Sequence, residues 1–303
     1  MFWCRPTRRS RRRRKAARLS FNVGPTEELS MQPTLDLRAL ALEMKTAQDS
    51  VRQIRPFTDR LPTFDLPAAY EVANHIHHAR LAEGAKPVGR KIGFTNPDMW
   101  SKFGVREPIW AYIYDTTVFQ LKDTAATCKL SNFAEPKIEP EIVLHFHTAP
   151  QVEGGLRGVV DAIDWVAHGF EIVQSHFPGW KFQAPDTVAD WSLHGTLLIG
   201  PPLPLAQLGN DPIAALESFS LTLSCNSRHI ETGKGSNVLG SPLSAIAHLI
   251  SVLAKQVPYA PLHAGEIVTT GTITTAQSVF AGETWQSELH GVRLSGLKVV
   301  FTA

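Results

Sequence analysis

Two glutamates one residue apart, Glu139 and Glu141, are the side chains best placed to do chemistry together in this chain. They lie in residues 137–144, an apolar run that we predict to be a β-strand. Alternate side chains of a strand project to the same face, so both carboxylates point the same way. Two neighbouring carboxylates repel each other unless a cation or a proton lies between them. Carboxylate oxygens suit a hard divalent ion, so the spacing predicts a site for Mg²⁺ or Mn²⁺.

A third acid and a competing interpretation both bear on this site. Glu171 lies in a second apolar run, residues 167–173, so three acids from two strands would form one metal-binding face. The alternative is that Glu139 and Glu141 form the exposed polar face of an edge strand, where Pro140 would also be tolerated. The spacing leaves both interpretations open and by itself favours the second.

Two histidines, His145 and His147, continue the same strand face if the strand extends that far. Four residues of strand span about 13 Å, so His145 lies too far from Glu141 to share one ion with it. We expect both histidines to be polar face residues or partners of ligands.

A lysine, Lys91, lies between Gly89 and Gly93 in the strand-like residues 88–95. Glycine in a strand often marks the close approach of a backbone or a ligand. Burial can lower the pKa of a lysine enough for acid–base chemistry. The alternative is an ordinary exposed lysine.

Other catalytic motifs are absent or incomplete in the sequence. Residues 232–237 lack the GxxxxGK[ST] order of a phosphate loop, so we interpret them as a tight glycine loop before a helix. No GxSxG motif is present. The cysteines, Cys4, Cys128 and Cys225, form no CxxC pair and fit a reducing compartment such as the cytoplasm.

The charge of the chain is unevenly distributed. Residues 1–20 contain nine Lys or Arg and no acid, whereas residues 31–303 contain 21 basic and 26 acidic residues, a net charge of −5. A mildly acidic body argues against a nucleic-acid-binding surface. The basic run is typical of a nucleic-acid tail, a localisation signal or a transit peptide. Because Met31 directly precedes the first helical pattern, we interpret residues 1–30 as a disordered basic extension outside the working protein.

Hydrophobic periodicity predicts a helical N-terminal region at 31–84 and a catalytic β-rich domain at 85–303. Helical patterns cover residues 35–54, 66–83, 155–165 and 242–256. Strand patterns cover residues 88–94, 109–114, 138–147, 166–174, 195–200, 217–225, 266–271 and 292–301. No run approaches the roughly 20 apolar residues of a membrane span.

Five motifs occur in order along residues 31–303, and together they resemble one family. They are Gly89-Arg90-Lys91-Ile92-Gly93-Phe94-Thr95, Glu139-Pro140-Glu141, Phe170-Glu171-Ile172-Val173, Asp186-Thr187-Val188-Ala189-Asp190 and Glu231-Thr232-Gly233-Lys234-Gly235. The chain resembles the 2-keto-4-pentenoate hydratase/4-oxalocrotonate decarboxylase family of the fumarylacetoacetate hydrolase superfamily. The resemblance implies an α+β fold with a mixed β-roll or barrel-like body and a small helical N-terminal region.

The resemblance also implies the composition of an active site. Glu139, Glu141 and Glu171 match the family's three carboxylates that bind Mg²⁺ or Mn²⁺. Lys91 matches the catalytic lysine, and Asp115 resembles an acidic residue that follows the next strand.

Further residues are candidates for shaping the pocket or contacting the substrate. Thr270 matches a position that contacts the substrate carboxylate in relatives, and Arg90, like Arg106, is a candidate donor to a second carboxylate. One departure stands out, because Asp190 is followed by Trp191, Ser192, Leu193 and His194 where the family's hydratases carry Asn and small residues. We expect Trp191 to narrow the pocket or to exclude water.

The function implied by the resemblance is a metal-dependent hydratase in the catabolism of aromatic-type compounds. It would add water to a 2-hydroxy-2,4-dienoate, giving a 4-hydroxy-2-oxo acid, with Lys91 and Asp115 moving the proton. One alternative is decarboxylation of 2-oxo-3-hexenedioate (4-oxalocrotonate). Another is acylpyruvate-type C–C hydrolysis with His168 or His194 as general base.

A binding protein without activity is the alternative from another class, and the intact acids and Lys91 argue against it. We expect a small-molecule acid as substrate and a homo-oligomer in the cytoplasm. We expect no nucleic-acid partner and no membrane partner.

Overall fold

The computed structural model describes residue 1 and residues 35–97, 100, 105–150, 155–256 and 259–303. Residues Leu35–Ala303 form one compact unit. The basic extension expected at residues 1–30 lies, apart from residue 1, outside the described residues.

The larger of two mixed sheets in the described residues contains nine strands. Seven follow the order β2-β1-β11-β5-β6-β7-β3, while β12 pairs with β5 and β8 pairs with β6. The bounds are β1 (Pro87–Gly93), β2 (Ile109–Tyr114), β3 (Val118–Gln120), β5 (Lys137–Phe146), β6 (Ile163–Val173), β7 (His194–Ile199), β8 (Leu203–Pro204), β11 (Ile267–Thr272) and β12 (Gln277–Ser278).

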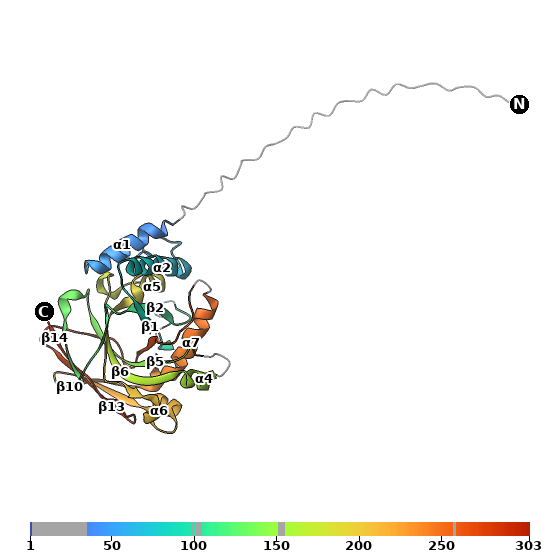
Figure 1. The fold of residues 1–303 in the computed structure, drawn as a ribbon. Helices are drawn as coiled ribbons and strands as arrows, with labels where there is room; N and C mark the ends of the chain where they lie inside the picture. Colours follow the sequence, from blue (N-terminus) through green and yellow to red (C-terminus); the bar gives the residue numbers. More distant parts are fainter. Residues whose placement is uncertain (2–34, 98–99, 101–104, 151–154, 257–258) are drawn as a thin grey trace. The chain divides into compact units, whose positions relative to one another are not determined.

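The second sheet has five strands in the order β10-β9-β13-β14-β4. These are β4 (Ala125–Lys129), β9 (Ser220–Cys225), β10 (Arg228–Lys234), β13 (Thr284–His290) and β14 (Lys298–Thr302). The helices are α1 (Leu37–Asp49), α2 (Leu66–Ala82), α4 (Gly155–Asp161), α5 (Ala184–Ala189), α6 (Pro212–Ser218) and α7 (Pro242–Lys255). Figure 1 shows α1, α2 and α5 together at one end of this unit and β10, β13 and β14 at the other. The expected α+β fold is confirmed.

The alternation of side chains along β5 separates a packed face from a chemical one. Ile138, Ile142 and Leu144 are fully buried in the main core, together with apolar residues of the second sheet and of α7. The next residues along the strand, Glu139 and Glu141, project to the opposite face, as the period of two requires.

The N-terminal helices are fixed to the β-rich body through α5. Asp36 and Asp65 cap α1 and α2, each accepting a hydrogen bond from a backbone N–H of the first turn. In α5, Asp186 accepts hydrogen bonds from Thr58 N (3.1 Å) and Thr58 Oγ1 (2.5 Å). The helices and the strands therefore share one compact unit, and a domain boundary near residue 84 stays a prediction.

Some elements differ from the sequence patterns. The helix expected at 155–165 ends at Asp161, and β6 follows at Ile163. The structure also contains β13, which the patterns did not reveal, and it places residues 232–234 in β10 instead of a loop. The glycine of that segment misled the prediction: a Cβ at Gly233 would lie 2.2 Å from Ile273 O, so glycine is needed there for close strand packing.

One helical stretch of the described residues, Gly235–Lys255, is long and apolar enough by composition to cross a membrane, with a hydropathy of 1.5. Half of that apolar window is buried inside the protein. Since α7 contributes Leu243, Ile246 and Leu249 to the main core, its apolar character has a packing explanation.

Candidate active site

The three predicted acids come together on one face of the larger sheet. Glu139 and Glu171 are direct cross-strand partners in the antiparallel pair β5–β6, and Glu141 lies one face position further along β5. One carboxylate oxygen from each of the three lies within 4.8 Å of the others. This separation lets a single ion with oxygen ligands at about 2.0–2.6 Å reach all three.

The competing interpretation, an exposed edge strand, is wrong. β5 lies between β11 and β6 inside the sheet. Glu141 and Glu171 are completely buried, and Glu139 is partly buried. Burying ionised carboxylates is costly unless their charge is compensated, so these acids need a cation or a proton beside them.

A β-bulge in β11 fixes the orientation of Glu141. Between Thr269 and Thr272 the β11–β5 register shifts by one residue, which aims two donors at Glu141 Oε2. They are Thr269 Oγ1 and, at 2.9 Å, the backbone N–H of Gly271. The other oxygen, Oε1, is buried and has no hydrogen-bond partner among the described residues.

The bulge requires glycine at position 271 for two reasons. Its φ of +97° is one that side chains with a Cβ rarely adopt. A Cβ there would also lie 1.9 Å from Thr95 Oγ1. The Thr-Gly sequence of this segment therefore serves to place donors next to an acid.

Glu171 is held by a lysine on one side and a histidine on the other. Lys91 Nζ lies 3.1 Å from Glu171 Oε2, and His194 Nδ1 lies 2.7 Å from Oε1. The second nitrogen of His194, Nε2, is 2.9 Å from Thr117 Oγ1. Because both of its ring nitrogens are engaged, the imidazole is fixed in place and can hold the Glu171 carboxylate in the orientation that a metal ligand needs.

The protein groups of the site carry more negative than positive charge, and burial and these charges together shift the pKa values of the three acids. Burial raises the pKa of Glu139 to about 7, against the opposing charge of Lys91 and with the support of Glu171. Burial and the charges of Glu171 and Glu139 raise the pKa of Glu141 well above its ordinary value. Burial would also raise the pKa of Glu171, but Lys91 and His194 outweigh it and lower this pKa to about 2.

The expectation that Lys91 has a lowered pKa is wrong, because three carboxylates surround the ammonium group. Burial lowers it, but the charges of Glu171, Glu139 and Glu141 outweigh burial and raise the pKa above the ordinary value. Burial lowers the pKa of His194 despite the nearby Glu171, which favours a neutral ring. Three carboxylates therefore face one ammonium group.

These observations fit a divalent cation. The donor set is three oxygen ligands, one buried Glu141 oxygen has no hydrogen-bond partner in the described structure, and a charge of +2 would neutralise the excess of the carboxylates over Lys91. Glu139, Glu141 and Glu171 are the residues that would hold the ion.

A cavity of about 330 Å³ adjoins the acids. Lys91 and Glu139 form part of its wall. The remaining wall is mixed, with aromatic, apolar and hydroxyl side chains from β1, β11 and residues 180–193. The volume suits a small organic molecule.

Two predicted residues lie away from this cavity. Arg90 precedes Lys91 on β1 and points to the opposite face, where it pairs with Glu266 at 2.6 Å. Asp115 follows the far end of β2 and accepts a hydrogen bond from Lys86 N at 3.0 Å. Lys91 pairs with Ala111 in the ladder, and four residues of strand separate Asp115 from that position by about 13 Å. The structure therefore does not support a proton shuttle between Lys91 and Asp115, or a substrate contact of Arg90.

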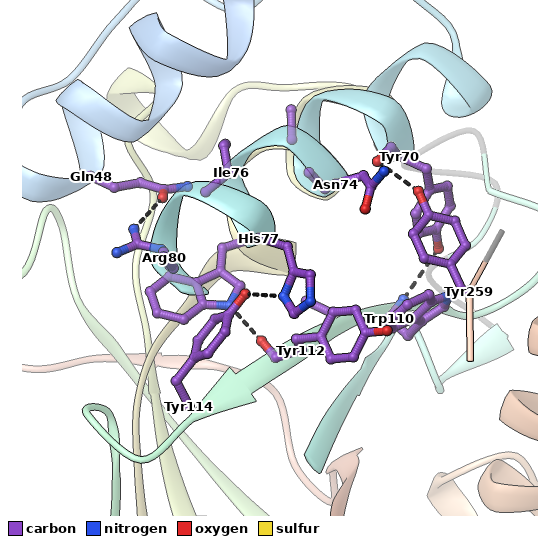
Figure 2. A pocket seen from close by; sticks show the side chains of 14 residues that line it. Gln48, Tyr70, Asn74, Ile76, His77, Arg80, Trp110, Tyr112, Tyr114 and Tyr259 are labelled. Carbon is purple, nitrogen blue, oxygen red and sulfur yellow. Dashed lines mark hydrogen bonds between the residues drawn. The ribbon is translucent and has the colours of Figure 1, made fainter. Parts of the chain in front are cut away.

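Thr270 and Trp191 lie near the site, but their polar groups point to backbone carbonyls. The hydroxyl of Thr270 donates to Ile142 O at 3.1 Å, and it is the neighbouring Thr269 that contacts Glu141. The indole N–H of Trp191 donates to Tyr112 O at 2.6 Å, and its ring lines a separate aromatic pocket (Figure 2). The expectation that Trp191 narrows the substrate pocket is corrected, since Ser192 and Leu193 line the larger cavity instead.

The histidines of the sequence analysis have structural partners. His145 Nδ1 lies 2.6 Å from Asp164 Oδ1, and His147 Nε2 lies 3.0 Å from Asp161 O. His168 is buried, with Nδ1 at 2.9 Å from Glu141 O and Nε2 at 2.8 Å from Ser287 Oγ. Burial lowers the pKa of His168 to about 4.

Sequence reasoning missed the partners of the acids. Nothing in the sequence distinguishes Thr269 from Thr270 as the group facing Glu141, because this depends on the register that pairs Thr269 with Val143, a residue on the same face of β5 as Glu141. His194 was considered only as a base, since its contact with Glu171 depends on the pairing of β6 with β7.

Comparison with known proteins agrees with this arrangement. The family model described as fumarylacetoacetate (FAA) hydrolase C-terminal matches residues 95–297. The chain belongs to the fumarylacetoacetate hydrolase family.

Individual family members cover most of the chain. It is 30% identical over 246 residues to 2-hydroxyhexa-2,4-dienoate hydratase of Comamonas testosteroni, which covers 80% of this chain and 89% of that protein. It is 30% identical over 247 residues to 4-oxalocrotonate decarboxylase of Pseudomonas putida, which covers 81% and 89%. The solved structure of 4-oxalocrotonate decarboxylase from Pseudomonas putida G7, complexed with magnesium and adipate, superimposes with a TM-score of 0.80 at 27% identity, covering 89% of this chain and 100% of that one.

Proposed function

We propose that this chain is a divalent-metal-dependent hydratase that adds water to a 2-hydroxy-2,4-dienoate to give a 4-hydroxy-2-oxo acid. The observation that carries the proposal is the group of Glu139, Glu141 and Glu171 beside Lys91 at a cavity of about 330 Å³. The hydratases among its relatives support the reaction class.

Lys91 is the proton carrier in this proposal. It lies in the wall of the cavity, and its contact with Glu171 holds the ammonium group in a fixed place. In 2-hydroxypenta-2,4-dienoate the hydroxyl proton leaves the oxygen on C2 and a proton is added at C5, which gives a 2-oxo-3-enoate. Water then adds its hydroxyl to C4 and a proton to C3. General acid–base help by a positioned group contributes typically about 10²–10⁴-fold.

The three carboxylates have a binding role. We propose that they hold Mg²⁺ or Mn²⁺, with His194 and Thr269 fixing the orientation of Glu171 and Glu141. When bound, the divalent ion supplies Lewis-acid stabilisation of negative charge on the substrate oxygen. The magnesium in the related decarboxylase structure supports the choice of a hard divalent ion.

Decarboxylation of 2-oxo-3-hexenedioate is the second candidate, and one observation favours it. Such a substrate has a distal carboxylate, for which the cavity offers a second cation, Lys137. Lys137 Nζ lies 4.0 Å from the centroid of the Trp180 ring, which also lines the cavity. Arg90 and Arg106, the donors considered from sequence, do not line it.

Acylpyruvate-type hydrolysis fits less well, because its general base is missing from the expected place. Both ring nitrogens of His168 are engaged in the core, and both of His194 are engaged by Glu171 and Thr117. Neither imidazole has a free nitrogen to activate water.

The test uses the protein with Mg²⁺ or Mn²⁺ and an EDTA-treated control. 2-Hydroxypenta-2,4-dienoate and 2-oxo-3-hexenedioate are supplied separately, and ultraviolet absorbance and CO₂ release are followed. Metal-dependent loss of dienoate absorbance with formation of 4-hydroxy-2-oxopentanoate is the expected result. Release of CO₂ from the diacid assigns the decarboxylase instead, and inactivity toward both compounds contradicts both assignments.

The biological setting follows from the same proposal. We propose a small-molecule oxo acid as substrate, a role in the catabolism of aromatic-type compounds, a cytoplasmic location and a homo-oligomeric assembly. Size measurement in solution and fractionation of cells test the last two.

A further inference from the structure

Ser192 is a buried polar residue that the proposed mechanism does not use. Its side chain is 2% exposed and lines the cavity of about 330 Å³ beside Lys91 and Glu139. Its Oγ has no hydrogen-bond partner within the described part of the chain. Buried hydroxyl groups in folded proteins are nearly always hydrogen-bonded, so this one has room for a partner supplied from the cavity.

The backbone at Ser192 is held in an unfavourable conformation. Trp191, Ser192 and Leu193 have φ values of +54°, +48° and +64°, the left-handed region that residues with a Cβ seldom adopt. Strain of this kind persists only where the surroundings enforce it, and it concentrates at functional sites.

Contacts on both sides of the turn enforce that conformation. Before it, Asp190 accepts hydrogen bonds from His176 N (3.0 Å) and His176 Nδ1 (2.7 Å). At its start the Trp191 indole donates to Tyr112 O, and the Arg80 guanidinium lies 4.4 Å from the Trp191 ring centroid. Figure 2 shows that Arg80 in turn donates a hydrogen bond to Gln48, a residue of α1.

After the turn the chain is fixed just as firmly. The carbonyl of Leu193 accepts a hydrogen bond from Gln174 N at 2.9 Å, and the next residue, His194, contacts Glu171. The turn is therefore clamped between the aromatic pocket and the candidate metal ligands. The result is a hydroxyl held at a fixed place in the cavity wall.

We propose that Ser192 is a substrate-binding residue whose hydroxyl donates a hydrogen bond to an oxygen of the bound 2-oxo acid. The inference takes the class of substrate, a 2-oxo acid, from the proposed function. It adds the Ser192 hydroxyl as a contact that discriminates between substrates. A polar group in a site rejects analogues that leave it without a partner. A carboxylate or oxo oxygen is the acceptor that such a substrate offers.

The test measures binding instead of turnover. 2-Oxopentanoate, a saturated 2-oxo acid with no double bond to hydrate, is titrated calorimetrically into the full chain with Mg²⁺. Loss of a hydrogen bond to a charged group should weaken its binding by about 10- to 100-fold in Ser192→Ala. Ser192→Gly should show the same loss, although glycine relieves the left-handed strain and should not lower the melting temperature.

A second buried serine is the matched control. Ser175 is also fully buried, but its Oγ donates to Phe177 O at 2.9 Å and lies outside the cavity. Ser175→Ala should lower the melting temperature and leave the affinity for 2-oxopentanoate unchanged.

The outcomes separate this inference from the proposed function. Equal affinity in wild type, Ser192→Ala and Ser192→Gly overturns the role of Ser192, whatever the activity assay shows. Weaker binding in both variants supports it even where neither the dienoate nor the diacid is converted. Absence of any 2-oxopentanoate binding by the wild type overturns the role of Ser192, while conversion of the dienoate or the diacid decides the proposed function separately.

Discussion

Two neighbouring residues of β1, Arg90 and Lys91, are both almost fully buried cations, yet they lie in very different surroundings. Arg90 pairs with Glu266 at 2.6 Å, and its guanidinium lies 3.9 Å from the Tyr112 ring centroid. Tyr112 also lines the aromatic pocket of Figure 2, whose volume is only about 30 Å³. Lys91 faces three carboxylates beside a cavity of about 330 Å³.

The difference shows how burial of charge can serve either the fold or the chemistry. On the Arg90 side one cation faces one acid and two aromatic rings, so the charges balance, although Arg90 Nε also has no hydrogen-bond partner among the described residues. The Lys91 side has an excess of negative charge, a Glu141 oxygen with no hydrogen-bond partner among the described residues, and room for a ligand. An unbalanced and open site of this kind is suited to bind an ion and an anion together.

The largest effect is expected from removing one of the acids. Glu141→Gln should abolish Mg²⁺ binding and reduce turnover by at least about a thousand-fold, since the Lewis acid is worth several kcal/mol. The metal-free variant should be at least as stable as the wild type, because the unfavourable charge reflected in the raised pKa of Glu141 is gone. Calorimetric titration of Mg²⁺ and thermal melts measure both. A variant that still binds Mg²⁺ with wild-type affinity contradicts the ligand role.

Replacement of the site cation should come next in size. Lys91→Met should lower kcat by about 10²–10⁴-fold while Mg²⁺ binding persists, since the three carboxylates remain. Full turnover by this variant would remove Lys91 from the mechanism. Steady-state kinetics at saturating Mg²⁺ provide the measurement.

The matching change on the other face should damage the fold instead. Arg90→Met leaves Glu266 without its partner and removes the contact with Tyr112. Breaking a fully buried pair costs about 3–5 kcal/mol, and because the Glu266 side chain is 15% exposed the loss should lie at or below the lower end of that range. Urea denaturation should show this loss. In the folded fraction, kcat should change far less than in Lys91→Met, and an equal loss of kcat would refute the division between the two faces.

A smaller effect is expected from the partner of Glu171. His194→Ala removes the 2.7 Å contact with Oε1 and the link to Thr117. Loss of an outer-shell partner costs about 10- to 100-fold in metal affinity. The measurement is Mg²⁺ titration at fixed pH, and Thr196→Val serves as a control because that hydroxyl donates to Thr117 O and touches no acid.

The smallest effect is a pH dependence of stability from the aromatic side. Burial, His78 and Arg90 lower the pKa of His77 to about 4, below the ordinary value of 6.5. A lowered pKa in the folded state means that the stabilisation is complete above pH 6.5 and is lost as the pH falls toward 4. The free energy of unfolding, measured in urea between pH 7 and pH 4.5, should fall less steeply in His77→Phe than in the wild type. Identical slopes would contradict this assignment.

The parts of the fold with strong local patterns were predictable. The helices predicted at 66–83 and 242–256 agree within one residue with α2 and α7, and the strand predicted at 109–114 coincides with β2. The glycine of β10 was misread as a loop signal, because its meaning depends on Ile273, about 40 residues away. Substrate contacts assigned to Arg90 and Trp191 failed for the same reason, since the direction of each side chain depends on neighbouring strands.

The sequence by itself determined the family, the three acids, Lys91 and the alternation that puts the acids on one strand face. The alternation follows from the fixed period of a strand, which is a local property, whereas the family and the candidate roles of the acids and Lys91 follow from the resemblance of five motifs. Only the tertiary structure decided that β5 is a central strand, that the β11–β5 register places Thr269 and not Thr270 on the face of Glu141, and that Ser192 faces the cavity. Those features depend on strand register and on contacts between distant segments, which local spacing does not encode.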